Sequence, residues 1–148
     1  MSIVLSVNIS KIKGISKKPV EKATAIKNYG IFGDAHAFIG STRQISLLNF
    51  IEIGEFDKNL PFGIFAENIT ISGISSEYIS IGSILKIGNV IIKITQIGKT
   101  CHSDCNIKKM LGSCIMPQKG IFGVVLSGGI IRPQMFIEVL NGKYFLCK

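Results

Sequence analysis

The chain has 148 residues, of which 47% are apolar and 18% are charged. This balance excludes intrinsic disorder, and the length suits a single domain over residues 1–148. The 28 isoleucines favour strands over helices, because a branched Cβ suits a pleated surface. A helical bundle, a coiled coil and a low-complexity protein are therefore excluded.

The formal net charge is +8, and the excess consists almost entirely of lysine. Lysine lacks the planar fork with which arginine reads bases, and here the lysines are scattered, so we expect attraction for a small anion and no nucleic-acid partner. No segment approaches the roughly 18 apolar residues of a membrane helix, and the N-terminus lacks the pattern of a signal peptide. We therefore expect a cytoplasmic protein with no membrane partner, whose four cysteines are thiols.

The first third of the chain predicts short strands between loops. Alternating apolar residues at its start are typical of a half-buried strand. In chain order we expect a strand over 3–9, a basic loop over 11–19, a strand over 22–27, an irregular segment over 29–40 and a short strand over 43–46.

The middle of the chain predicts a helix and a turn. Ser46 is a candidate N-cap for a helix that ends at Phe56, because apolar residues follow it at 3–4 spacing. Residues 61–68 contain a proline and a glycine and predict a turn, with a short helix as the alternative.

The remaining chain predicts mainly strands separated by glycines. Ser103 is a candidate cap for a short helix over 103–111. Many short strands with few helices favour a mainly β fold, closed or nearly closed into a barrel. The expected strands cover 69–72, 78–81, 84–87, 90–96, 121–126 and 135–140.

The segment Gly30-Ile-Phe-Gly-Asp-Ala-His36 is the first candidate site. Two glycines let a backbone approach a ligand closely, and the loop amides can bind an anion. In an extended loop, Asp34 and His36 would lie on the same side. The alternative is a turn with a hydrogen-bonded Asp34 and a surface His36.

The segment Gly63-Ile-Phe-Ala-Glu-Asn68 is the second candidate. Glu67 and Asn68 stand among apolar residues, so a buried carboxylate with a partner is expected. Arg43 is the natural partner. A substrate-facing role and a structural role in holding two loops together both remain open.

Three cysteines within 14 residues, Cys101, Cys105 and Cys114, form the third candidate. Lys99 and His102 flank Cys101, and a nearby cation lowers the pKa of a thiol. The spacing leaves three alternatives open: inert apolar residues, one reactive thiol, or a metal site such as zinc, although the paired C-x2-C spacing of most zinc sites is absent.

Taken together and in this order, the motifs resemble the MOSC domain, named after the C-terminal part of molybdenum cofactor sulfurases. The resemblance covers roughly residues 3–140. Its later part is similar to small stand-alone bacterial members. The matching segments are Lys18-Pro-Val20, Tyr29-Gly-Ile-Phe-Gly-Asp-Ala-His36, Arg43-Gln-Ile-Ser-Leu-Leu48, Gly63-Ile-Phe-Ala-Glu-Asn-Ile-Thr-Ile-Ser-Gly73, Ile81-Gly-Ser-Ile-Leu-Lys-Ile-Gly88 and Thr95-Gln-Ile-Gly-Lys-Thr-Cys101.

The resemblance implies a MOSC-type β-barrel with a few short helices and a role with the molybdenum cofactor (molybdopterin). It implies that Cys101 is a molybdenum ligand or persulfide carrier, with Cys105 as the counterpart if the loop is shifted. Some relatives reduce N-hydroxylated compounds, which would require a separate electron donor. The positions that match residues lining the family's cleft are Asp34, His36, Arg43, Glu67 and Asn68. Gly33 and Lys99 are further expected cofactor-binding residues, although Lys99 departs from the arginine that many relatives have before the cysteine.

Two functions follow as hypotheses. In the first, the protein binds or carries the cofactor or its sulfur through a cysteine, with Cys101, His36 and Asp34 as reactive groups. In the second, it is a non-catalytic module of cofactor assembly, and Cys101, Cys105 and Cys114, together with His102, hold a structural zinc ion. Partners would be cofactor biosynthesis enzymes or molybdoenzymes. A pyridoxal-phosphate-type binder is a third reading, but no lysine stands out for a Schiff base.

Overall fold

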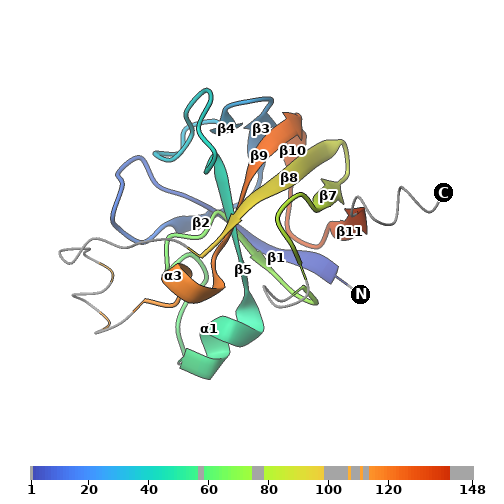
Figure 1. Ribbon diagram of the computed structural model, residues 1–148. Coiled ribbons are helices and arrows are strands. Elements are labelled where there is room, and N and C mark those ends of the chain that lie inside the picture. Colours follow the sequence, from blue (N-terminus) through green and yellow to red (C-terminus); the bar gives the residue numbers. More distant parts are fainter. Residues whose placement is uncertain are drawn as a thin grey trace.

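The computed structural model describes residues 2–56, 59–74, 79–98, 107, 111 and 114–140 (Figure 1). The described part is mainly β, with two short helices, α1 (Phe50–Phe56) and α3 (Met116–Lys119). The strands are β1 (Ser2–Ile9), β2 (Lys18–Val20), β3 (Ala23–Ile26), β4 (Gly30–Ile31), β5 (Ile45–Asn49), β6 (Ile69–Ile71), β7 (Ile84–Ile87), β8 (Val90–Ile97), β9 (Ile121–Ser127), β10 (Gly129–Ile131) and β11 (Phe136–Leu140).

Seven of the described strands close into a barrel in the order β11-β7-β8-β9-β5-β6-β1, and β1 then pairs with β11. Neighbours are antiparallel except for β5 and β6, which are parallel. The C-terminal half of β1 also pairs with β2. A parallel pair needs a crossover connection, and this one contains α1 and the turn before β6.

A second, three-stranded sheet has the order β10-β3-β4. Figure 1 shows it at the end of the barrel opposite to α1. The strand β10 follows β9 after one residue, so the small sheet continues directly from the barrel wall. This arrangement places the loop after β4 at the end of the barrel away from α1.

Branched apolar side chains fill the barrel. Buried positions alternate along β3 and β7, as a pleated strand with one face inward requires. The central β5 is buried on both faces, because Leu47 packs into the barrel while Leu48 packs into a second apolar cluster outside it. The second cluster also includes Ile53 of α1 and Met116 of α3.

Most of the expected strands are confirmed. The main error is the helix that was expected to begin at Ser46. Ser46 does not cap a helix: it lies inside β5, and α1 begins at Phe50. A strand buried on both faces is a continuous apolar run, which local spacing cannot distinguish from a helix. The residues 79–81 of the expected strand over 78–81 are not in a strand. Most of the expected helix over 103–111 lies outside the described residues.

Candidate functional site

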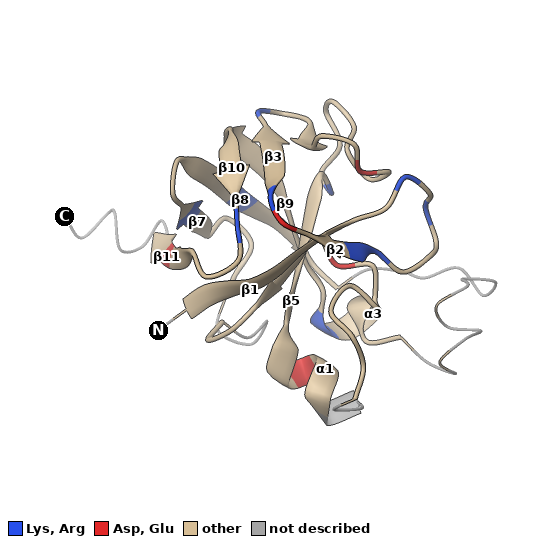
Figure 2. Cartoon of the chain, turned by 180° about the vertical axis from the view of Figure 1, so that it is seen from behind, with Lys and Arg blue, Asp and Glu red and all other residues tan. Residues whose placement is uncertain are grey.

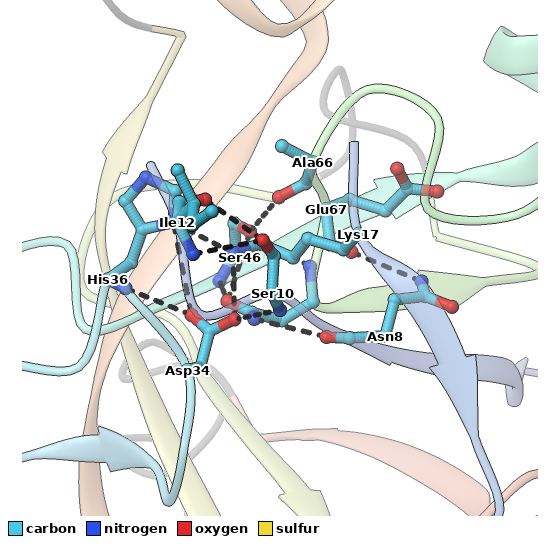
Figure 3. A network of polar contacts seen from close by, with 10 residues as sticks. Asn8, Ser10, Ile12, Lys17, Asp34, His36, Ser46, Ala66 and Glu67 are labelled. Atoms are coloured by element: carbon cyan, nitrogen blue, oxygen red, sulfur yellow. Dashed lines mark hydrogen bonds and ion pairs between the residues drawn. The ribbon is translucent and has the colours of Figure 1, made fainter. Parts of the chain in front are cut away.

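Asp34 is the centre of a buried polar cluster at the end of β1 (Figure 3). Its Oδ1 accepts a hydrogen bond from the backbone N–H of Ser10 at 3.0 Å, and its Oδ2 accepts one from the N–H of His36 at 3.1 Å. The N–H of Ala35 donates to the carbonyl of Ser10 at 2.7 Å. These bonds fasten the loop after β4 to the residue that follows β1.

Lys17 completes the cluster. Its Nζ lies 2.8 Å from Asp34 Oδ1 and 2.9 Å from His36 Nδ1. His36 Nδ1 lies 3.8 Å from Asp34 Oδ2, too far for a hydrogen bond. An ammonium only donates, so Nδ1 must accept from Lys17, and the imidazole proton must therefore be on Nε2. The side chain of His36 is 33% exposed, whereas those of Lys17 and Asp34 have no exposed surface.

The charge of Lys17 keeps Asp34 ionised. Burial acts to raise the pKa of Asp34 by desolvating the carboxylate. The hydrogen bond and positive charge of Lys17, together with the Ser10 N–H, outweigh burial and hold the pKa below its ordinary value. The result is an ion pair with a neutral imidazole at its solvent side.

The carboxylate of Glu67 is held by hydrogen bonds from neighbouring residues of the chain. Its Oε2 accepts from the N–H of Gly63 at 3.0 Å and the hydroxyl of Thr70 at 2.7 Å, and its Oε1 accepts from the N–H of Phe65 at 3.2 Å. Burial raises the pKa of Glu67 above its ordinary value, although these donors act in the opposite direction. The carboxylate closes the turn at residues 61–66 from inside.

Asn68 joins this turn to the barrel. Its Oδ1 accepts from the N–H of Ser46 at 2.9 Å, and its Nδ2 donates to the carbonyl of Asn8 at 3.3 Å. The side chain thereby bridges β5 and β1. Both Glu67 and Asn68 are fully buried.

The turn at residues 61–66 lies between the Asp34 cluster and the apolar cluster outside the barrel. On one side the N–H of Lys17 donates to the carbonyl of Gly63 at 2.8 Å, and the hydroxyl of Ser16 donates to the carbonyl of Ile64 at 2.7 Å. On the other side Ile64 belongs to the apolar cluster against which the half-buried Cys114 also packs. The turn therefore connects the Lys17 segment to the neighbourhood of Cys114.

The structure brings only some of the expected site residues together. Asp34 and His36 are in direct contact, and Gly33 precedes them with a φ of +85° that suits glycine. Arg43 is exposed, and the Glu67 carboxylate is bonded to other groups, so the expected pairing of Arg43 with Glu67 is wrong. Cys101, Cys105 and Lys99 lie outside the described residues. Within the described ranges, no cluster of three or more His, Cys, Asp or Glu side chains forms a metal site.

Lys17 is the site residue that sequence reasoning missed. Lys17 stands directly before the segment Lys18-Pro-Val20, outside the motif that the resemblance matched. Ion pairing across 17 residues depends on the loops folding back together, and no local pattern reports that.

A surface depression of about 420 Å³ is separate from this cluster. It is lined by Lys86, Gly88, Phe136 and Glu138 of the β7–β11 region. Phe136 pairs with Ile3 near the start of β1, whereas Ser10 follows the other end of β1.

The fold, a closed barrel with a buried ion pair at one rim, places this protein among small β-barrel domains. The family model for the MOSC domain matches residues 33–137, and the chain belongs to that family. The matched range contains Asp34, His36, Glu67, Asn68 and the whole cysteine segment. No curated protein matches the sequence.

Solved structures show the same fold. The YuaD protein from Bacillus subtilis aligns with a TM-score of 0.74 and 18% identity, over 94% of this chain and 96% of its own. YiiM from Geobacillus stearothermophilus aligns with a TM-score of 0.71 and 21% identity, over 95% of this chain and 76% of its own. YiiM from Escherichia coli aligns with a TM-score of 0.67 and 16% identity, over 95% of this chain and 70% of its own.

Proposed function

We propose that this protein binds the molybdenum cofactor, or carries its sulfur, through a cysteine of residues 101–114. Membership of the MOSC family is the observation that carries the proposal. A thiolate is both a soft metal ligand and the nucleophile of sulfur transfer. The cofactor, when bound, would supply the redox or sulfur chemistry, while the protein supplies a ligand and orientation.

The chemistry of the described groups fits an anionic ligand. A neutral His36 with its proton on Nε2 is a hydrogen-bond donor at the edge of the cluster. Exposed lysines of the loop at residues 10–17, Lys11 and Lys13, add positive charge nearby. A pterin phosphate would be attracted by this charge and oriented by the imidazole N–H.

The remaining expected residues would have supporting roles. Asp34 would act as a positioning residue, because it holds Lys17, which in turn orients His36. Glu67 and Asn68 would keep the turn at residues 61–66 against β1 and β5. Lys99 would lower the pKa of the neighbouring thiol. Arg43, exposed at the rim, would attract the anion without touching Glu67.

We place the protein in the bacterial cytoplasm, with cofactor assembly enzymes or molybdoenzymes as partners. Reduction of N-hydroxylated compounds is the enzymatic form of the proposal and would need a separate electron donor. The single-domain organisation over residues 1–148 stays a prediction.

Molybdenum content tests the proposal directly. The purified protein is loaded with the cofactor, desalted and analysed for molybdenum, alongside Cys101→Ala, Cys105→Ala and Cys114→Ala. The matched control is Cys147→Ala, since that cysteine is 33 residues beyond Cys114 in the chain. We expect one of the three variants to lose at least about tenfold in retained metal, with the control unchanged.

Equal retention by all four variants would exclude cysteine ligation. Near-stoichiometric zinc that resists dialysis in the fresh protein, and is lost in the same three variants, would instead favour the assembly module with a structural metal. Persulfide content of each variant, measured after incubation with a sulfur donor, separates sulfur carriage from metal binding.

A further inference from the structure

Two loops at the Asp34 cluster expose large apolar side chains. The His36 loop (residues 31–40) carries Phe32, Phe38 and Ile39, which are 68%, 68% and 69% exposed. The lysine loop (residues 10–17) carries Ile12, which is 63% exposed. Exposed apolar residues concentrated in one region mark a contact surface, whereas single ones are ordinary.

The two loops lie side by side and are held firmly. Besides the Ala35–Ser10 backbone bond, Asp34 of the His36 loop binds Lys17 of the lysine loop. The N–H of Phe38 donates to the carbonyl of Tyr29 at 2.8 Å, which fixes the far end of the His36 loop. Figure 3 shows Ser10, at the start of the lysine loop, beside Asp34 of the His36 loop, to which its N–H donates. The apolar side chains are therefore presented on a pre-ordered platform at little further entropic cost.

The lysine loop and the segments next to the two loops in the sequence are rich in exposed positive charge. Asp34 is buried and neutralised by Lys17, so it contributes no free negative charge at the surface. Figure 2 shows basic residues along the loop between β1 and β2, on the side away from the N-terminus. Between positions 10 and 43, exposed basic residues outnumber exposed acidic ones. The acidic one is Glu21, and the basic ones are Lys11, Lys13, Lys18, Lys22, Lys27 and Arg43.

The composition favours a lipid surface over a protein partner. Protein interfaces are enriched in aromatic residues and arginine, but they are depleted in lysine. Here phenylalanine and isoleucine stand among lysines, the combination by which peripheral proteins adsorb to anionic membranes. Lysine suits a fluid array of anionic headgroups, because its charge needs no fixed bidentate geometry.

We propose that the His36 loop and the lysine loop dock this protein reversibly on an anionic phospholipid surface. Phe32, Phe38, Ile39 and Ile12 enter the headgroup region, and the lysines contact the lipid phosphates. No helix among the described residues could cross a bilayer, and the sequence led us to expect no membrane partner. Adsorption at the surface needs no spanning segment. This docking therefore replaces the expectation of no membrane partner, and it does not depend on the cofactor proposal.

Vesicle co-sedimentation tests the docking. The full chain is mixed with vesicles of phosphatidylcholine alone or of phosphatidylcholine with phosphatidylserine. We expect binding to the serine-containing vesicles at least about tenfold stronger, weakening as salt is raised. The double variant Phe32→Ser/Phe38→Ser should lose at least about tenfold, and Lys11→Gln/Lys13→Gln should lose the preference for phosphatidylserine.

Phe136→Ser is the matched control, because Phe136 is 65% exposed but lies on β11 near the start of β1. It should bind vesicles like the wild type. Equal loss in this control, or full binding by Phe32→Ser/Phe38→Ser with unchanged circular dichroism, would overturn the proposal. So would an absence of vesicle binding at low salt. A wild-type dimer in light scattering that Phe32→Ser/Phe38→Ser converts to a monomer would assign the loops to a second copy of this chain instead.

Discussion

The ammonium of Lys17 lies 2.8 Å from the carboxylate of Asp34, and neither side chain reaches solvent. Removing one partner of such a pair leaves an uncompensated buried charge. We predict that Lys17→Met destabilises the protein by about 3–5 kcal/mol in urea unfolding monitored by circular dichroism.

Two controls accompany this measurement. Lys18→Met removes an exposed neighbouring charge and should change stability by less than about 0.5 kcal/mol. The double variant Lys17→Met/Asp34→Asn should recover part of the loss, because it removes the stranded carboxylate as well. Equal effects of Lys17→Met and Lys18→Met would contradict the ion pair.

Because the pKa of Asp34 is lowered, the free energy of unfolding depends on pH in the acidic range. In the folded protein Asp34 binds its proton more weakly than in the unfolded chain, where the ordinary pKa is 3.8. Its contribution is therefore present above pH 3.8 and is lost as the pH falls through the lowered folded value. We predict that the stability difference between wild type and Asp34→Asn shrinks across this range, measured as the free energy of unfolding at successive pH values. A constant difference would contradict the prediction.

Gly63 is held in a conformation and a space that only glycine fits. Its φ is +86°, and a Cβ there would collide with the carbonyl oxygen of Lys17. Gly40 has a nearly equal φ of +82° but open space around it. Gly40→Ala should therefore cost about 1–2 kcal/mol from backbone strain alone, and Gly63→Ala should cost clearly more. Thermal unfolding of the two variants compares them; equal midpoints would contradict the close contact with Lys17.

The geometry predicts which ring nitrogen of His36 carries the proton, and NMR spectroscopy can test this. Because Lys17 donates to Nδ1, we expect the proton on Nε2 near neutral pH. Long-range 1H–15N correlation spectra distinguish the two ring nitrogens, and with two histidines in the chain His36→Asn assigns the signals. Lys17→Met should release the constraint and yield a mixture of tautomers. A protonated Nδ1 in the wild type would contradict the geometry.

The strand pattern was largely readable from the sequence, because one buried face imposes period-two alternation. The strands β3 and β7 illustrate this, and β7 and β8 were found with nearly their observed bounds. The strand β1 was also found, but its buried residues do not alternate, because its register shifts between Val4 and Ser6. The segment from Ser46 to Asn49 failed for a tertiary reason: β5 meets β6 and β9 laterally and apolar clusters on both faces, so its local sequence carries no alternation.

Only part of the candidate site could be predicted from the sequence. Asp34 and His36 stood out because a charged and an imidazole side chain interrupt an apolar background two residues apart. Lys17 did not, because one lysine among fifteen looks like a solvated charge until the fold buries it. Glu67 was correctly expected to be buried, but its partners are two backbone N–H groups and the hydroxyl of Thr70, and no arginine is among them.

The junction of β1 with β11 is short: Ser2 pairs with Ile137, and Ile3 pairs with Phe136. This pairing closes the sheet into a barrel. An open sheet of isoleucine-rich strands would instead offer two unpaired edge strands to neighbouring molecules. Local opening there would expose templates for intermolecular strand addition, so shelf life and resistance to aggregation depend on the first few residues of the chain.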